Sequence, residues 1–277
     1  MNPVTLPDGE PVPALGMGTW MMGEVPALRR EETAALRTGV ELGITLIDTA
    51  EMYGEGRTEQ FLGEALAGCR DRVFLVSKVY PHNASRQGVR RACEQSLRRL
   101  RTDRLDLYLL HWRGREPLAE TVAGFEDLRA AGKIRHWGVS NFDTADLEEL
   151  FALPGGERCA ANQVLYNLTR RGPEFELLPW MDRRRLPLMA YSPIEQGRIP
   201  DGGALAEIAA RNGVTRWQAA LAWVLRRSGT IAIPKASREE HVRRNGAALG
   251  LRLSEADLDR LDLQFAPPRR GRPLEML

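Results

Sequence analysis

The stretch VFLVSKVYPHNASRQGVRRACEQSLRRLRTDRLDLYLLH, residues 73–111, decides the fold. Apolar runs at 73–76 and 105–110 flank residues 86–100, whose apolar side chains recur at helical spacing. Two continuous apolar runs separated by an amphipathic helix are typical of neighbouring parallel strands that are covered by helices. The stretch therefore predicts one strand–helix–strand unit of a parallel sheet.

The same unit repeats along the chain. Further strands are expected at 14–17, 45–47, 135–139, 160–163, 188–190 and 231–233, and further helices at 31–42, 58–67, 117–131, 144–152, 174–185, 203–227 and 238–248. Because no Pro-, Gly- or Ser-rich linker divides these units, the pattern predicts an α/β fold, a closed (β/α)8 TIM barrel that forms one domain over residues 1–277. A doubly wound open sheet is the alternative.

Three additions to the barrel are expected. Leu6-Pro-Asp-Gly9 lies between short extended pieces, so it predicts an N-terminal β-hairpin. Asn212-Gly213 followed by Thr215 indicates a helix end and a new N-cap, which divides 203–227 into two helices. A last helix over 254–263 leads into a Pro- and Arg-rich tail, which we expect to cross one mouth of the barrel.

Composition and charge limit the classes of molecule that the protein is expected to bind. Lys and Arg total 39 against 37 Asp and Glu, and a formal net charge of +2 predicts no general attraction to nucleic acid or membrane. Cys69, Cys93 and Cys159 are odd in number and share no metal-type spacing, so we expect reduced thiols and no metal site. With neither a leader-like N-terminus nor a long apolar run, the protein is expected in the cytoplasm, as a monomer that acts on a small molecule.

Four polar residues are candidates for one site. Asp48, Lys78 and His111 each end an apolar run, and Tyr53 follows Asp48 in a loop. The carboxyl ends of parallel barrel strands face the same rim, so these side chains should converge there. Singly, each has an ordinary interpretation: a turn cap, a snorkelling lysine, a core histidine and an exposed loop aromatic. At one rim of one barrel they favour a proton-transfer site.

The chemistry of such a group is acid catalysis. A tyrosine has an unperturbed pKa of about 10, and a neighbouring ammonium such as that of Lys78 lowers this value. Asp48 would pair with Lys78 and keep it charged, and a neutral His111 can donate a hydrogen bond to a carbonyl oxygen. The set would protonate an oxygen as negative charge builds on it. A nucleophilic serine is not indicated, because the chain has no Gly-x-Ser-x-Gly motif.

Motifs from about residue 4 to residue 263 carry a family resemblance. They are Gly16-Met-Gly-Thr-Trp20, Leu46-Ile-Asp-Thr-Ala-Glu-Met-Tyr-Gly54 with Glu59, Ser77-Lys78, Asp106-Leu-Tyr-Leu-Leu-His-Trp112, Gly132-Lys-Ile-Arg-His-Trp-Gly-Val-Ser-Asn-Phe142, Asn162-Gln163, Ala190-Tyr-Ser-Pro193 and Ile233-Pro-Lys235. In this order they are similar to the aldo-keto reductases and, within them, to bacterial diketogulonate and methylglyoxal reductases. The resemblance implies an NADPH-dependent carbonyl reductase that transfers a hydride from the nicotinamide to an aldehyde or ketone.

The resemblance also implies residue roles. Tyr53 would be the general acid, Asp48 and Lys78 its tuning partners, and His111 the group that orients the carbonyl. The substrate would contact Trp20, Tyr53, His111 and Trp112. The cofactor would contact Gly18, Thr19, Trp20, Asp48, Ser140, Asn141, Gln163 and Tyr191 around the nicotinamide, Ser192, Pro193, Ile194 and Gln196 along the pyrophosphate, and Lys235, Ala236, Ser237, Arg238, His241 and Asn245 at the adenosine end.

Departures from the family pattern set further expectations. Ala236 and His241 replace a frequent serine and arginine, so NADH use becomes plausible beside NADPH. The loop after His111 and the tail after Phe265 look short, which predicts an open site for small or medium aldehydes and ketones. Two alternatives remain at this stage: a cofactor-sensing interaction protein on the same barrel, and an unrelated barrel with aldolase or isomerase chemistry.

Overall fold

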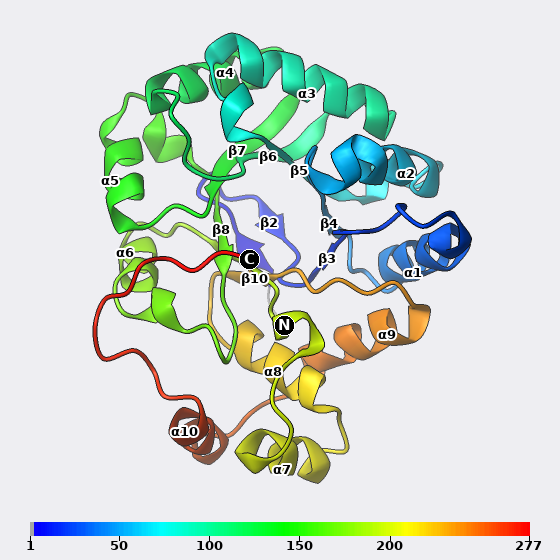
Figure 1. The fold of residues 1–277 in the computed structure, drawn as a ribbon, viewed down its shortest axis with the longest axis vertical. Helices are drawn as coiled ribbons and strands as arrows, with labels where there is room; N and C mark the ends of the chain where they lie inside the picture. The colour runs from blue at the N-terminus through cyan, green and yellow to red at the C-terminus, as the bar shows by residue number, and fades with distance from the viewer. Residues whose placement is uncertain (1–2) are drawn as a thin grey trace.

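The computed structural model describes residues 3–277, so the first two residues of the expected 1–277 domain lie outside the description. Eight parallel strands form one sheet in which each strand pairs with the next along the chain (Figure 1). The predicted strands are confirmed, with ends shifted by up to a few residues. Their bounds are β3 Gly16–Gly18, β4 Leu46–Asp48, β5 Phe74–Val79, β6 Leu105–Leu110, β7 Ile134–Ser140, β8 Asn162–Leu165, β9 Leu188–Tyr191 and β10 Thr230–Ala232.

The sheet closes into a barrel between its first and last strands. Parallel bridges join Leu15 to Ala232 and Gly18 to Lys235. The amide of Gly18 also donates to the Pro234 carbonyl at 3.1 Å. Pairing along the whole ring removes the free edges that an open doubly wound sheet would keep. The barrel prediction is therefore confirmed, and all carboxyl ends of the strands share one rim.

Helices surround the barrel, as expected of a parallel sheet. Their bounds are α1 Arg29–Glu41, α2 Arg57–Ala65, α3 Arg86–Leu100, α4 Leu118–Ala130, α5 Thr144–Ala152, α6 Leu177–Arg183, α7 Gly203–Arg211, α8 Arg216–Leu225, α9 Glu239–Ala247 and α10 Glu255–Gln264. The predicted break near residue 213 is confirmed, because Thr215 and Gln218 form a capping box that starts α8. The segment expected as a helix at 174–185 is shorter, because a 3₁₀ turn at Gly172–Glu174 precedes it.

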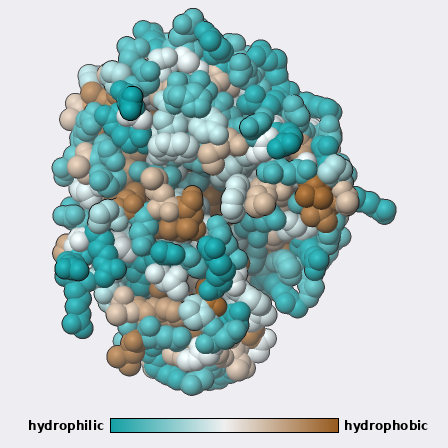
Figure 2. Space-filling view, viewed as in Figure 1, coloured by the Kyte–Doolittle hydropathy of each residue, from teal (hydrophilic) through white to brown (hydrophobic). Residues whose placement is uncertain are grey.

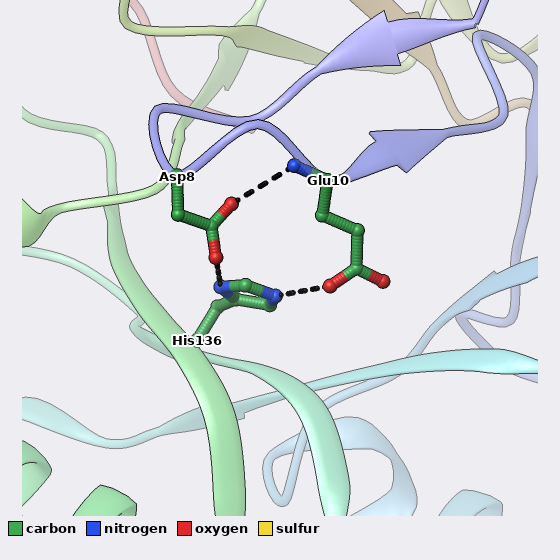
Figure 3. Close-up of side chains that lie close together, drawn as sticks. All are labelled: Asp8, Glu10 and His136. Carbon is green, nitrogen blue, oxygen red and sulfur yellow. Dashed lines mark hydrogen bonds and ion pairs between the residues drawn. The ribbon is translucent and has the colours of Figure 1, made fainter.

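The N-terminal hairpin, β1 Val4–Thr5 and β2 Pro11–Val12, lies at the end of the barrel away from the viewer in Figure 1. Its apolar residues Val4, Leu6 and Val12 are buried in the core. Polar side chains hold it to β7: the Glu10 carboxylate lies 2.8 Å from Nε2 of His136, and the Asp8 carboxylate lies 3.4 Å from Nδ1 (Figure 3). The hairpin is thus fixed by both apolar burial and charge.

The remaining expectations concern cysteines and membranes. Cys93 and Cys159 are buried and Cys69 is half-buried, and all three are free thiols. Burial raises the pKa of Cys93 and of Cys159 to about 12, so both stay protonated and unreactive near neutral pH. Within residues 3–277, the helices are too short or too polar to cross a membrane.

Candidate active site

Asp48, Tyr53, Lys78 and His111 meet at the carboxyl rim of the barrel. Asp48 ends β4, Lys78 lies one residue before the end of β5, and His111 follows β6. The Nζ of Lys78 lies 2.7 Å from Asp48 Oδ2, 3.2 Å from the Tyr53 hydroxyl and 2.8 Å from the carbonyl oxygen of Thr49, so its three donors are all used. The predicted convergence is confirmed for this set.

A short irregular segment places the tyrosine. Tyr53 begins a 3₁₀ turn, Tyr53–Gly56, in which Gly54, Glu55 and Gly56 have positive φ. Gly56 has a φ of 87°, a conformation that favours glycine, and a Cβ there would also displace the Arg99 side chain, whose Cδ would lie 2.7 Å away. The turn brings the Tyr53 ring back over β5, where the Lys78 ammonium lies 4.9 Å from its centroid. Local backbone geometry thus converts a loop aromatic into a site residue.

Burial dominates the acidity of Tyr53. Burial and the Asp48 carboxylate together raise the pKa of the Tyr53 hydroxyl more than the Lys78 ammonium lowers it, so this pKa lies above its ordinary value. The expectation that Lys78 brings this pKa below its ordinary value is therefore wrong: the cation acts in the predicted direction, but desolvation of the phenolate and the charge of Asp48 outweigh it. In this site Tyr53 is protonated at neutral pH.

Lys78 is charged and His111 is neutral. Burial alone would lower the pKa of Lys78, but Asp48 and Tyr53 raise it above its ordinary value, so the ammonium persists. Burial, together with repulsion from Lys78, lowers the pKa of His111 to about 2. Within residues 3–277, Nδ1 of His111 is buried without a hydrogen-bond partner. The imidazole is neutral, as predicted, and its ring lies edge-on to Tyr53 at 6.1 Å between centroids.

A second polar set lies beside the first. The side-chain NH2 group of Gln163 donates a hydrogen bond to Asp48 Oδ1 at 2.8 Å. The side-chain carbonyl oxygen of Gln163 takes no part in this bond. The Ser140 hydroxyl donates to the Gln163 backbone carbonyl at 2.9 Å, and the Tyr191 hydroxyl donates to Asn141 Oδ1 at 3.1 Å. The sequence placed these residues near the cofactor but did not predict that Gln163 binds Asp48 directly. Both sets therefore form one connected network.

These residues open into a single cavity of about 830 Å³. Three of the four predicted catalytic residues, Asp48, Tyr53 and His111, line the cavity. The fourth, Lys78, is fully buried beneath them. The other predicted residues in the wall are Gly18, Thr19, Trp20, Trp112, Ser140, Asn141, Gln163, Tyr191, Ser192, Pro193, Ile194, Gln196, Lys235, His241 and Asn245. Figure 2 shows apolar surface at the centre of this face, within a mostly hydrophilic surround.

Three predicted cofactor residues do not line the cavity. Ala236 is buried, the Ser237 hydroxyl lies 3.4 Å from Glu32, and Arg238 pairs with Glu31 at 3.2 Å with a largely exposed side chain. Other residues line the cavity without having been predicted: Met21, Met52, Gly197, Thr215, Trp217, Gln218, Ile233, Pro234, Arg244, Met276 and Leu277. The Thr215–Gln218 motif indicated a helix start, but nothing local to it shows that α8 starts at the cavity.

The tail corrects the expectation of an open rim. After α10 the chain crosses the carboxyl face and ends over the barrel centre (Figure 1). Met276 and Leu277 line the cavity together with Trp20 and Trp112. The tail is therefore long enough to wall the site, and the prediction that it crosses one mouth is confirmed. Its length in sequence was a poor guide, because an extended chain can span up to about 3.3–3.6 Å per residue.

The donor set fits a dinucleotide. Near the four-residue cluster, the cavity offers the Ser140 hydroxyl, the Asn141 amide and the half-buried ring of Tyr191, which suit a carboxamide and a flat ring. At another part of the wall it offers the cationic side chains of Lys235 and Arg244, which suit phosphate oxygens. No Gly-x-Gly-x-x-Gly motif follows the first strand, so the binding mode differs from that of a Rossmann fold.

Comparison with known proteins identifies the family. Residues 14–263 match the model of the Aldo/keto reductase family. The chain belongs to the aldo-keto reductase family. This aldo-keto reductase is 54% identical over 271 residues to methylglyoxal reductase YeaE of Escherichia coli (strain K12), covering 96% of this chain and 95% of that protein. The family resemblance seen in the motifs is thus confirmed.

Two further relatives bear on the cofactor. A crystal structure of an aldo-keto reductase from Klebsiella pneumoniae in complex with NADPH has a TM-score of 0.97 to this reductase, at 51% identity and with 100% of both chains covered. An NADH-specific methylglyoxal reductase of Escherichia coli (strain K12) is 32% identical over 302 residues, covering 88% of this chain and 91% of that protein. Both nicotinamide cofactors therefore occur among the relatives.

Proposed function

We propose that this reductase uses NADPH to reduce small, neutral aldehydes and ketones, with 2-oxoaldehydes such as methylglyoxal as the preferred class. The observation that carries the proposal is the Lys78 ammonium, held between Asp48 and the Tyr53 hydroxyl at the floor of a cavity that neutral His111 also lines. The NADPH complex of the Klebsiella relative and the activity named for the E. coli relative support the cofactor and the substrate class.

Each of the four residues has a defined part in this proposal. The neutral imidazole of His111 donates a hydrogen bond to the carbonyl oxygen and orients it beside Tyr53. Tyr53 gives its hydroxyl proton to that oxygen as negative charge develops there. The Lys78 ammonium then stabilises the phenolate, and Asp48 keeps the ammonium in place. A reduced nicotinamide, when bound, supplies the hydride that reaches the carbonyl carbon.

The cofactor is held by the residues of the cavity wall. Ser140 and Asn141 bind the carboxamide, and the Tyr191 ring packs against the nicotinamide plane. Gln163 contributes through its side-chain carbonyl oxygen, because its amide is already bound to Asp48. At the adenosine end we assign the phosphate contacts to Lys235 and Arg244, which face the cavity. Arg238 would first have to leave Glu31, so its predicted contact is the weakest of the set.

The carbonyl end of the cavity is apolar. Trp20, Met21, Met52, Trp112 and the tail residues Met276 and Leu277 line it. Within residues 3–277, the carboxylate, ammonium and guanidinium side chains in the cavity wall are those of Asp48, Lys235 and Arg244. Of the two cations, Lys235 follows β10 and Arg244 lies in α9. A carboxylate on the substrate would lose hydration at the apolar end without gaining a cation. Neutral 2-oxoaldehydes should therefore be preferred to keto acids and sugar acids.

A rate panel tests the proposed function. NADPH oxidation is followed at 340 nm with methylglyoxal, a neutral aromatic aldehyde and a 2-keto acid, and is then repeated with NADH. We expect kcat/KM for methylglyoxal to exceed that for the keto acid by at least about ten-fold. This ratio corresponds to a free-energy cost of roughly 1.4 kcal/mol or more for placing an unpaired carboxylate in the apolar end of the cavity. Equal rates with the keto acid would contradict the apolar-pocket assignment.

Tyr53→Phe tests the acid. The variant should retain NADPH binding, because a ring of the same shape remains, while kcat falls about 10²- to 10⁴-fold. The matched control is Tyr108→Phe, which removes a buried hydroxyl that has no partner within residues 3–277 and lies on β6 away from the cavity. Unchanged turnover in Tyr53→Phe would remove Tyr53 from the acid role. Cofactor binding by the wild type without turnover of any carbonyl would favour the interaction-protein alternative.

Four expectations from the sequence stay predictions. They are a monomer, a cytoplasmic location, a single domain over residues 1–277 and the absence of a nucleic-acid partner. Size-exclusion chromatography with light scattering tests the first of these against the 31.0 kDa chain mass.

A further inference from the structure

One arginine, Arg170, links two segments that lie far apart in the sequence and both line the cavity. Its Nη2 lies 3.1 Å from Glu195 Oε1, and its Nη1 lies 3.3 Å from Glu275 Oε1. Glu195 belongs to the loop 192–197, most of which lines the cavity on the side assigned to the pyrophosphate. Glu275 directly precedes Met276 and Leu277, which line the cavity and are assigned to its carbonyl end in the proposed function. The Arg170 guanidinium therefore connects the loop to the tail.

The backbone of the loop 192–197 needs external support. Ser192, Glu195 and Gln196 have φ of 46°, 48° and 53°, which non-glycine residues rarely adopt. Such conformations are strained and persist only where the surrounding structure imposes them. Here Asn167 donates to the Ser192 carbonyl at 2.9 Å and to Glu195 Oε2 at 2.8 Å, while Arg170 binds the other oxygen of Glu195. The Arg170 contact is thus part of what holds the loop.

Arg170 forms ion pairs with two carboxylates, those of Glu195 and Glu275. Glu195 is nearly buried, at 8% side-chain exposure, whereas Glu275 is half-exposed. Two carboxylates share this guanidinium, and the other cation facing Glu195 is Arg198, at 3.7 Å. Without Arg170, Glu195 and Glu275 would repel each other, so the attraction that joins loop and tail would change sign. The position of the tail therefore depends on the position of the loop.

We propose that Arg170 is a positioning residue that couples the loop 192–197 to the tail, so that the dinucleotide and the carbonyl substrate bind cooperatively. The inference rests on the proposed function. A dinucleotide that fixes the loop also fixes Glu195, and through Arg170 it holds Met276 and Leu277 over the carbonyl end. Because coupling between two binding sites is reciprocal, a change on the tail side must alter cofactor affinity even though Glu275 does not line the cavity.

Glu275→Gln is the main test. NADPH binding is measured by protein fluorescence quenching, and the KM for methylglyoxal is measured at saturating NADPH. We expect both the NADPH Kd and the KM to rise by about two- to five-fold, the range of a partly exposed ion pair, while kcat stays within about two-fold. In 0.5 M NaCl, the NADPH Kd and the KM of Glu275→Gln should differ much less from those of the wild type, because salt screens the exposed ion pair in the wild type. A merely structural role would lower Tm without this salt-dependent pattern.

Arg170→Met and the double variant complete the cycle. Arg170→Met should raise both constants at least as much as Glu275→Gln. In the Arg170→Met background Glu275→Gln should raise neither constant further, because the pair is already lost and the substitution only relieves the repulsion between the two carboxylates. Arg170→Lys should rescue one of the two contacts and give intermediate values, since an ammonium lacks the planar fork. Asp127→Asn, which breaks the exposed Arg86–Asp127 pair between α3 and α4, is the matched control and should leave both constants unchanged.

The outcomes separate this inference from the proposed function. If the wild type binds NADPH and reduces methylglyoxal but Glu275→Gln leaves the NADPH Kd unchanged, the coupling is overturned and the function stands. Additive effects of Arg170→Met and Glu275→Gln overturn it as well. A wild type that neither binds NADPH nor turns over any carbonyl overturns the proposed function, and this inference with it.

Discussion

At the scale of single residues, burial decides how Tyr53 and His111 work. A buried phenol resists ionisation, so Tyr53 carries its proton over the whole neutral range despite the ammonium 3.2 Å away. The same burial removes the proton from His111. The site thus holds a protonated phenol beside a neutral imidazole. In the proposed mechanism Lys78 would act chiefly by stabilising the phenolate after proton transfer.

This arrangement predicts a flat pH profile for carbonyl reduction. Reduction needs protonated Tyr53, and nearly all molecules hold this proton at a pH well below the raised pKa of Tyr53. Reduction also needs neutral His111, and nearly all molecules have it at a pH well above the His111 pKa of about 2. We expect kcat with methylglyoxal at saturating NADPH to change by less than about two-fold between pH 6 and pH 9. A loss of kcat below pH 6.5 that disappears in His111→Gln would contradict the neutral-imidazole assignment.

At the scale of elements, the N-terminal hairpin is tied to the barrel by a compact charge network. Glu10 Oε2 accepts from Arg135 at 2.6 Å and lies 2.8 Å from His136 Nε2, and Asp8 contacts the other ring nitrogen. Arg135 also binds Asp106 at 3.1 Å. The guanidinium already neutralises Glu10, so we interpret Figure 3 as a hairpin clamp on β7.

Glu10→Gln tests this clamp. The substitution removes the charge that Arg135 and His136 share, so the free energy of unfolding should fall by about 1 kcal/mol, or about 2 °C in Tm for a chain of this length. Because the hairpin lies at the far end of the barrel from the cavity, kcat/KM should not change. Glu41→Gln at the exposed end of α1 is the charge-matched control. A loss of activity without a loss of stability would refute the purely structural role.

At the scale of the whole molecule, the barrel depends on a close approach between β3 and its neighbours. A Cβ on Gly16 would lie 2.5 Å from Leu46 Cδ2, 2.9 Å from the Leu46 carbonyl oxygen and 3.1 Å from Ile233 Cγ2. The backbone atom cannot move without displacing β4. Closure of the ring therefore requires glycine at this position for reasons of space, with no positive φ involved.

Gly16→Ala should weaken closure. We expect the free energy of unfolding to fall by about 1–3 kcal/mol, the usual cost of overpacking, which corresponds to a Tm lower by about 2–6 °C. Thermal unfolding by circular dichroism measures it. Gly250→Ala is the control, because a Cβ there meets nothing within 4 Å. Equal effects of the two substitutions would show that backbone entropy, rather than strand packing, sets the stability change.

Local patterns in the sequence predicted most of the elements and much of the site. The apolar runs and helical spacings predicted all eight strands and the split at Thr215, because these are periodicities of neighbouring residues. Strand ends predicted which polar residues share the rim. Arg244, Met276 and Leu277 were missed, because they line the cavity through the path of the chain and not through any motif of their own.

What the sequence by itself determined is the (β/α)8 barrel, the four-residue cluster of Asp48, Tyr53, Lys78 and His111, and the family. These depend on hydrophobic periodicity and on residue types at strand ends, which are local properties. Only the tertiary structure decided that the pKa of Tyr53 is raised despite Lys78, that the tail lines the cavity, and that Arg170 joins the tail to the loop 192–197. Desolvation and charge pairing depend on residues far apart in the chain, so no local pattern records them.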